Sequence, residues 1–152
     1  MNEQNGYDIE DLHVGMTATL AKTITEADIL LFSAVSTDVN ALHVNEEYAA
    51  STPFQGRIAH GMLSASLISA VLANRLPGPG TIYLAQNLTF LAPVRPGDTV
   101  QATVTVLEIG DKGRVSLQTT CRVKDVVVID GQAQVKIGSS ARRAASLVAA
   151  SR

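Results

Sequence analysis

The sequence has no tryptophan and one cysteine, Cys121, among its 152 residues. A lone cysteine excludes an intrachain disulfide and a cysteine-based metal cluster within one chain, so the reducing cytoplasm is the expected location. Aromatic residues make up 4% of the chain, and the formal net charge is −2. Nucleic-acid binding needs stacking platforms or a basic surface. We therefore expect no nucleic-acid partner.

The chain also lacks an apolar run long enough for a membrane span. The uncharged stretch Gly61–Asn74 is shorter than a bilayer requires and contains Ser64, Ser66 and Ser69. The first residues are polar and acidic, unlike a secretory leader. Hydrophobic residues nevertheless make up 46% of the sequence, enough for a packed interior. The length predicts one domain over residues 1–152, with no membrane association.

The first half of the chain predicts a strand followed by helices. Residues 15–23 alternate apolar with polar side chains, as a half-buried strand does. Thr25 is followed by acidic residues, a combination typical of a helix start, and this helix should extend to about Val35. A short helix is expected after Asn45. The residues of the first helix predicted to be buried are Ile29, Leu30, Phe32 and Ala34.

The segment 61–75 predicts a helix through the middle of the domain. No charged side chain lies between His60 and Arg75, and small or apolar residues fall on every face of the helical wheel. Such a helix is typically buried. At 1.5 Å per residue it would be roughly 20 Å long. Two Pro-Gly pairs, 77–78 and 79–80, should end it abruptly.

The remainder predicts strands joined by tight turns. Strands are expected at 81–91, 100–107, 115–123 and 126–137, with turns at 93–97, 110–113 and 124–125. In the second and third of these strands every other residue, from Val100 to Val106 and from Val115 to Cys121, is assigned to one, mostly apolar face. Asp130-Gly131 is a second possible hairpin turn, but it would leave very short strands, so Gly131 is interpreted as a bulge in a long final strand. Residues 138–152 should form a frayed tail or a marginal surface helix. The pattern predicts an α+β fold with an antiparallel sheet.

Asp38 and His43 are the best candidates for chemistry. On a helix their five-residue separation would point them apart, but the surrounding polar cluster predicts an irregular loop in which they can converge. An aspartate can orient a histidine, or both can hold one water molecule and move its protons. The alternative is a capping aspartate with a packed histidine, and from the pair alone that structural role is the commoner one.

Gly61 is a second candidate. A glycine in the first turn of a buried helix allows a ligand to approach the backbone, and its N–H is an unpaired donor where the helix dipole favours negative charge. It could equally do no more than start the helix, with His60 or a neighbour as the cap. Ser69 is expected to be a core serine. The sequence has no serine-nucleophile elbow, phosphate loop or His/Glu metal spacing.

Four blocks of the sequence together resemble a known family. They are 38–43 (DVNALH), 58–63 (IAHGML), 80–84 (GTIYL) and 93–98 (PVRPGD). Their order and content resemble the MaoC-like dehydratases, and among these the short R-specific enoyl-CoA hydratases, over roughly residues 10–137. The first block is fairly specific, the second is shared with wider hot-dog relatives, and the others are structural.

The resemblance implies a hot-dog fold, in which an antiparallel sheet wraps a long central helix, and pairing of two copies as a homodimer. It implies that Asp38 and His43 are catalytic, that the N–H of Gly61 binds the thioester carbonyl, that Asn40 braces the loop, and that Ser69 is a supporting polar residue beneath the site. The implied reaction adds water to a trans-2-enoyl-CoA and gives the (R)-3-hydroxyacyl-CoA, without metal or redox cofactor. Ionised Asp38 would take a proton from water, and neutral His43 would share that water and return a proton to the α-carbon.

One residue departs from the family pattern, and several questions stay open. Ala41 stands where family members commonly have proline, which affects the rigidity of the loop more than its chemistry. The alternatives are a hot-dog thioesterase, which typically uses a carboxylate in or near the central helix, and a non-catalytic acyl-thioester-binding subunit. The acyl-chain length, the pathway (polyester supply or β-oxidation) and the CoA phosphate contacts, with Arg57 and Arg95 as candidates, are undetermined.

Overall fold

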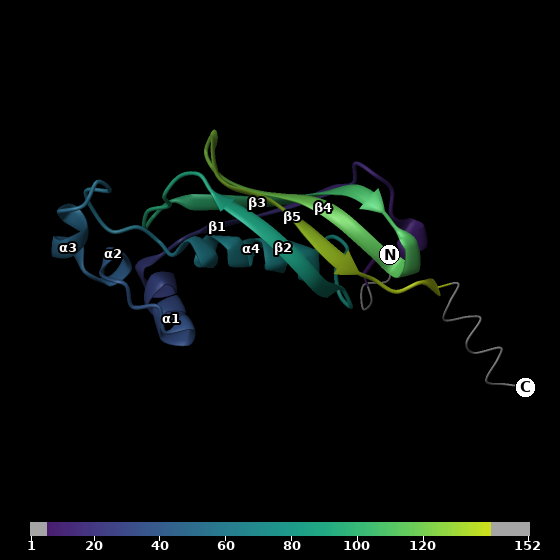
Figure 1. Cartoon of the computed structure of the whole chain (residues 1–152), viewed down its shortest axis with the longest axis horizontal. Helices are drawn as coiled ribbons and strands as arrows, with labels where there is room; N and C mark the ends of the chain where they lie inside the picture. The colour runs from purple at the N-terminus through teal and green to yellow at the C-terminus, as the bar shows by residue number, and fades with distance from the viewer. Residues whose placement is uncertain (1–5, 141–152) are drawn as a thin grey trace, which may run out of the picture.

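In the computed structural model, which describes residues 6–140, a curved antiparallel sheet covers one long helix (Figure 1). The strands lie in the order β1-β3-β4-β5-β2, so β1 and β2 are the edges. The α+β, hot-dog arrangement predicted above is confirmed. The strands are β1 (Thr17–Thr23), β2 (Ile82–Phe90), β3 (Thr99–Ile109), β4 (Arg114–Val123) and β5 (Val126–Lys136).

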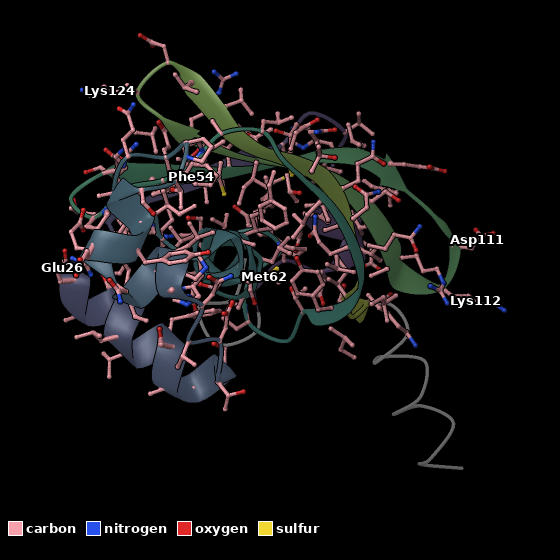
Figure 2. All side chains as sticks on the ribbon, turned by 60° about the vertical axis from the view of Figure 1, so that its left-hand side comes forward. Glu26, Phe54, Met62, Asp111, Lys112 and Lys124 are labelled. Atoms are coloured by element: carbon pink, nitrogen blue, oxygen red, sulfur yellow. The ribbon has the colours of Figure 1, made fainter. Side chains whose placement is uncertain are left out.

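Three short helices gather at one end of the sheet, and the long helix α4 lies along its face (Figure 1). Figure 2 shows Glu26 and Phe54 on this helical side, whereas Asp111 and Lys112 mark the hairpin at the opposite end. No helix within residues 6–140 combines the length and hydropathy needed to cross a bilayer. The helices are α1 (Glu26–Ser36), α2 (Ala41–Val44), α3 (Glu46–Ala50) and α4 (Gly61–Asn74), with 3-10 turns at Ile9–Asp11 and Asp111–Gly113.

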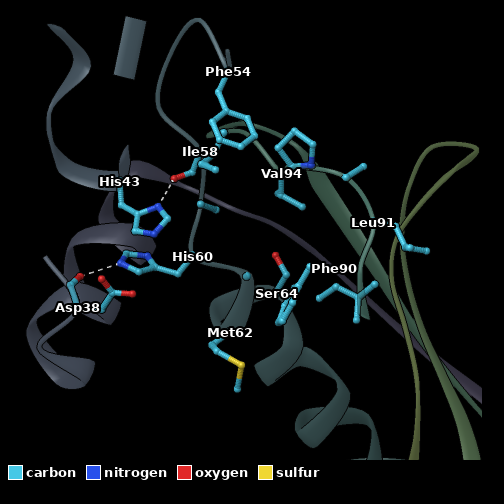
Figure 3. Close-up of a pocket in the computed structure, with 15 residues that line it drawn as sticks. Asp38, His43, Phe54, Ile58, His60, Met62, Ser64, Phe90, Leu91 and Val94 are labelled. Carbon is cyan, nitrogen blue, oxygen red and sulfur yellow. Dashed lines mark hydrogen bonds between the residues drawn. The ribbon is translucent and has the colours of Figure 1, made fainter. Parts of the chain in front are cut away.

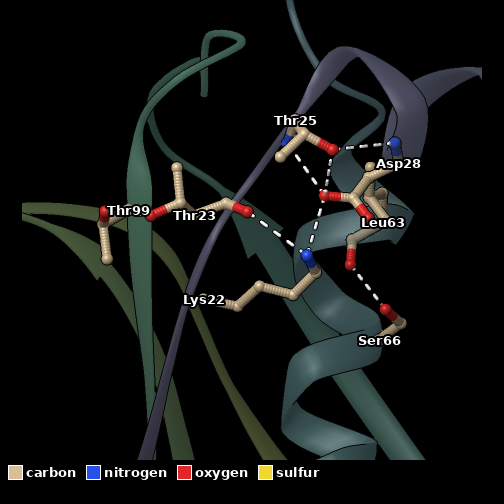
Figure 4. Close-up of polar contacts among 7 residues, drawn as sticks. All are labelled: Lys22, Thr23, Thr25, Asp28, Leu63, Ser66 and Thr99. Carbon is tan, nitrogen blue, oxygen red and sulfur yellow. Dashed lines mark hydrogen bonds and ion pairs between the residues drawn. The ribbon is translucent and has the colours of Figure 1, made fainter.

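The N-terminus of α1 has the predicted cap at Thr25. Thr25 Oγ1 accepts the N–H of Asp28 at 3.1 Å, and Asp28 Oδ2 accepts the N–H of Thr25 at 2.8 Å (Figure 4). Lys22 Nζ donates to the same carboxylate at 2.8 Å. The hydrogen bonds from Lys22 and Thr25 lower the pKa of Asp28 to about 2. This reciprocal capping fixes where the chain leaves β1 and enters the helical end of the molecule.

The core forms between α4 and the sheet. The residues of β3 and β4 that the alternation assigned to the interior are buried, as are Leu67, Ile68, Val71 and Leu72 of α4. Burial raises the pKa of the Cys121 thiol to about 12, so this thiol is not an available nucleophile. The strand residues concerned are Val100, Ala102, Val104, Val106, Val115, Leu117, Thr119 and Cys121.

Two predictions about helix burial are wrong in part. Ile29 is buried, but Leu30 is 59% exposed and Ala34 is exposed, because α1 touches the rest of the described chain along the stripe of Ile29 and Ser33. Helix α4 is also not buried all round, since Met62 and Ser69 lie on an exposed face. Apolar composition gave the central position of α4 correctly, but one face of it is left uncovered within a single chain.

Gly131 has a different role from the predicted bulge. It pairs in regular register with Leu88 of β2 and Thr119 of β4. The irregularities lie elsewhere, next to Tyr83 in one pairing and next to Cys121 in the other. A Cβ atom on Gly131 would come within 2.0 Å of the backbone oxygen of Asn87. Glycine is needed at this position because the backbone of β2 approaches β5 closely. It does not mark an extra residue in the strand.

The start of the predicted tail is attached to the N-terminal segment. The N–H of Ile9 donates to the carbonyl of Gly138 at 3.0 Å, and the hydroxyl of Ser140 donates to Glu10 at 3.2 Å. Ser139 also donates to Glu10. Residues 138–140 are therefore packed and not frayed, while the prediction for residues 141–152 lies outside the described part of the chain.

Replacing Gly131 with alanine should destabilise the protein. The added methyl group meets backbone, which cannot rotate away, so β2 and β5 must separate locally. We expect a loss of about 1–3 kcal/mol in the free energy of unfolding, the usual range for overpacking, measured by urea denaturation. The exposed neighbour Gln134, changed to alanine, is the control. Equal stability of both variants would contradict the close-approach interpretation.

Replacing Ala41 with proline should stabilise the protein. Ala41 is the first residue of α2, a position that proline favours, and the preceding Asn40 has φ −52° and ψ 132°, which a following proline tolerates. Ala41→Pro should add about 0.4–1 kcal/mol by restricting the unfolded chain. Thermal unfolding measures the gain. A lower melting temperature would show that the local backbone does not match proline.

Candidate active site

A cavity of about 440 Å³ lies at the N-terminal end of α4. It is bounded by α2, by the segment that precedes α4 and by the connection between β2 and β3 (Figure 3). Most of its lining is apolar, including Phe54, Phe90 and Val94. The polar side chains that line it are Asp38, His43, His60 and Ser64. A largely apolar pocket with a few convergent polar groups is typical of a small-molecule site.

His43 is held by a short helix, α2, and not by the irregular loop expected from the sequence. Asn40 begins this helix, and its Oδ1 accepts the N–H of Leu42 at 3.0 Å. His43 Nδ1 lies 2.8 Å from the carbonyl oxygen of Ile58. A carbonyl can only accept, so Nδ1 carries the hydrogen and Nε2 of the neutral ring has a free lone pair. His43 can therefore accept a proton or a hydrogen bond at the cavity.

Asp38 lies in the link between α1 and α2. Thr37, which ends α1, has a left-handed backbone with φ 63°, and this turns the chain toward α2. The N–H of Asp38 donates to Ser36 Oγ at 3.2 Å, and Asp38 Oδ1 accepts the N–H of Asn40 at 3.2 Å. Asn40 thus holds the Asp38 carboxylate through its backbone and the helix of His43 through its side chain.

His60 is the central residue that sequence reasoning missed. It is 1% exposed, and its Nε2 lies 2.9 Å from the backbone oxygen of Asp38 (Figure 3). Its ring stacks on that of His43, with centroids 3.9 Å apart. The sequence suggested His60 as a possible helix cap, but its side chain makes no capping hydrogen bond. The available signal was a histidine directly before a buried apolar helix.

Asp38, His43 and His60 could together hold a cation or a water molecule. One potential ligand atom from each lies within 4.8 Å of the others. His43 Nδ1 and His60 Nε2 are each occupied by a backbone carbonyl, so one nitrogen per ring remains. A water molecule can be held by the same carboxylate and imidazole without any metal. The expectation that the site needs no metal remains a prediction.

Gly61 starts α4 and lines the cavity. Its N–H has no acceptor among residues 6–140, as expected for the first residue of a helix. A Cβ atom here would lie 2.6 Å from the ring of Phe90, so the glycine allows the Phe90 ring to pack closely against the start of α4. The site therefore combines a carboxylate, an imidazole acceptor and a backbone donor at the positive end of a helix.

The expectation for Ser69 is wrong, and both arginine candidates for the CoA phosphates make contacts within the protein. Ser69 is exposed and does not line the cavity, whereas Ser64 does. Arg57, a candidate for the CoA phosphates, is engaged by Glu26 at 2.7 and 2.8 Å and by Glu46 at 2.9 Å, which raises the pKa of its guanidinium. Arg95, the other candidate, donates to the carbonyl of Phe54. Both arginines support the helical end of the molecule in this structure.

Comparison with known proteins places the chain in a family. Residues 13–130 match the family described as "MaoC like domain". An (R)-specific enoyl-CoA hydratase of Rhodospirillum rubrum is 58% identical over 129 residues, covering 84% of this chain and 90% of the relative. A 3-hydroxybutyryl-CoA dehydratase of Methylorubrum extorquens is 51% identical over 129 residues, covering 84% of this chain and 82% of the relative.

Solved structures show the same fold. The unliganded R-hydratase PhaJ1 of Pseudomonas aeruginosa superposes with a TM-score of 0.83 at 45% identity, covering 88% of this chain and 86% of that one. The (R)-hydratase of A. caviae, described as involved in PHA biosynthesis, gives a TM-score of 0.82 at 42% identity, covering 84% and 98%. With the family match extending over most of the sequence, this chain belongs to the MaoC-like domain family.

Proposed function

We propose that this protein is an (R)-specific enoyl-CoA hydratase. It adds water to a trans-2-enoyl-CoA to give the (R)-3-hydroxyacyl-CoA, and it catalyses the reverse dehydration. The observation that carries the proposal is the convergence of Asp38, His43 and the first turn of α4 on one cavity. The relatives named as (R)-specific hydratases and as a 3-hydroxybutyryl-CoA dehydratase support the same hydro-lyase class.

In the proposed mechanism, Asp38 and His43 hold the attacking water. The Asp38 carboxylate accepts one hydrogen bond from the water. His43 Nε2 accepts the other, because its Nδ1 hydrogen is held by Ile58. His60 keeps the pair in place, since it binds the backbone of Asp38 and stacks on the ring of His43. The water is then oriented with its oxygen lone pairs toward the β-carbon of the substrate.

The tautomer of His43 constrains the order of the proton transfers expected from the sequence. Neutral His43 has no hydrogen on Nε2, so it cannot donate a proton from that atom until it has accepted one. The proton that leaves the water onto the Asp38–His43 pair is therefore the one returned to the α-carbon. One hydroxide equivalent adds to the β-carbon and one proton to the α-carbon, so water is consumed and the enzyme is unchanged.

The start of α4 stabilises the charge that develops during addition. As the water oxygen bonds to the β-carbon, the electron pair of the double bond moves toward the thioester, and its carbonyl oxygen becomes negative. The free N–H of Gly61 and the helix dipole favour that charge. All of these groups belong to the protein, so the proposed reaction requires no metal or redox cofactor.

A thioesterase and a non-catalytic binding protein are the alternatives to test against. Both would bind the same acyl-CoA in the same fold. Helix α4 carries no carboxylate along residues 61–74, which disfavours a thioesterase that uses one there. The presence of an acid–base pair on the cavity disfavours a purely binding role.

Loss of either member of the pair should slow hydration. Asp38→Asn and His43→Gln should each reduce turnover of crotonyl-CoA by roughly 10²–10⁴-fold, the usual contribution of an acid–base group. The measurement is the loss of enoyl-thioester absorbance. Matched controls are Asp111→Asn and His13→Gln, which make the same changes at exposed positions outside the cavity.

The controls should retain full activity. Near wild-type rates in Asp38→Asn or His43→Gln would contradict the catalytic assignment. A wild-type protein that hydrates neither crotonyl-CoA nor longer enoyl-CoA substrates, but releases free thiol from acyl-CoA, would establish the thioesterase. Binding of acyl-CoA with neither reaction would establish the non-catalytic role.

We also propose that the protein acts in the cytoplasm as a homodimer joined through β2. This strand is a sheet edge with exposed apolar residues, among them Ile82 at 56% and Leu84 at 41%.

Light scattering should give twice the 16.0 kDa chain mass. Leu84→Asp should shift the mass toward one chain, because a charge on an interface strand opposes pairing. Val126→Asp, at an apolar residue that is 55% exposed away from β2, is the control. A monomeric wild type would contradict the proposal.

A further inference from the structure

Ser64 is a buried hydroxyl with no partner. It lies in the first turn of α4 and is 1% exposed, and its Oγ has no hydrogen bond among residues 6–140. The nearby Ser66 behaves differently, since its Oγ donates to the carbonyl of Leu63 at 2.6 Å. Bonding back to the preceding turn is the usual solution for a helix serine. An unpaired buried hydroxyl costs folding free energy, so its presence calls for a functional explanation.

The hydroxyl of Ser64 belongs to the candidate active site. Ser64 lines the same cavity as Asp38, His43 and Gly61. In Figure 3 its oxygen points into the space between Val94 and Phe90. Side chains on a helix lean toward the N-terminus, so Ser64 covers the turn that begins at Gly61. The donor hydroxyl and the free N–H of Gly61 therefore face the cavity from the same helical turn.

We propose that Ser64 is a further catalytic residue, whose hydroxyl donates a second hydrogen bond to the thioester carbonyl oxygen beside the N–H of Gly61. This inference rests on the proposed hydratase function. During addition of water the carbonyl oxygen gains negative charge and then returns to its neutral state when the α-carbon is protonated. Ser64 keeps its proton throughout, so no covalent bond to the serine forms or breaks. A second preorganised donor, shielded from solvent, stabilises the transition state more than the ground state.

The arrangement explains why the free protein tolerates an unsatisfied hydroxyl. A donor reserved for a charge that exists during the reaction has no partner before the substrate binds. Removing it should therefore affect catalysis and stability in opposite directions. A serine with a purely structural role would not produce that combination.

The test is Ser64→Ala, assayed with crotonyl-CoA beside the wild type. We expect kcat to fall about 10²-fold, as for loss of one oxyanion donor, with KM changed by less than about twofold because the donor acts in the transition state. Inhibition by the saturated butyryl-CoA should be unchanged. The melting temperature should be equal or higher, because an unpaired buried hydroxyl is removed.

Matched variants separate the hydroxyl from the space it occupies. Ser64→Thr and Ser64→Val introduce side chains of similar shape that differ in the hydroxyl, so Ser64→Thr should be at least tenfold faster if Ser64 is a donor. This comparison holds even if the larger side chains lower stability equally. Ser66→Ala, the same change on the exposed face of α4, should leave kcat unchanged.

The outcomes distinguish this inference from the function on which it rests. Wild-type activity with full activity in Ser64→Ala would mean that the hydroxyl binds an ordered water only, and would overturn the inference alone. Equal rates for Ser64→Thr and Ser64→Val, or loss of rate and stability together in all variants, would overturn it in favour of packing. A wild type that does not hydrate enoyl-CoA would overturn the proposed function and this inference with it.

Discussion

The packing of α4 against the sheet determines where the donor groups at the helix start lie in the candidate site. Buried residues such as Ile68 and Leu72 fix the helix along the inner face of β3 and β4. Because the helix is fixed, its first turn is fixed as well, and Gly61 and Ser64 face the cavity there. The site thus presents donors from a helix that is held by core packing, and donors held in place can stabilise charge without reorganisation.

Two hydrogen bonds from histidine side chains to backbone carbonyls connect the start of this helix to α2 and to the α1–α2 link. His43 reaches from α2 to the carbonyl of Ile58, and His60 reaches from the start of α4 to the carbonyl of Asp38. The two bonds run in opposite directions between the same segments, and the rings stack where they cross. Each bond also selects a tautomer, so the fold determines which nitrogen of His43 is left for proton transfer.

Polar groups without partners are concentrated at this point. His60 Nδ1 and Ser64 Oγ are buried without a hydrogen bond among the described residues, and both residues line the cavity. The polar groups of the Thr25–Asp28 cap and of the Arg57 guanidinium, by contrast, have partners within the protein. These buried groups without a hydrogen-bond partner therefore lie where a substrate would bind, which is a common feature of functional sites.

The sequence by itself determined most of the helices and strands and the residues that could carry chemistry, although the short helix α2 stands where a loop was expected. Alternation placed Val104 and Leu117 inside, Thr25 marked a helix start, and the block that contains Asp38 and His43 indicated a candidate acid–base pair, whose role in the reaction stays a prediction. Only the tertiary structure decided the rest. Gly131 is set by the approach of a distant strand, Ser64 rather than Ser69 faces the cavity, and His60 joins the pair. Local patterns report how a residue suits its own helix or strand, whereas these roles depend on contacts between segments far apart in the chain.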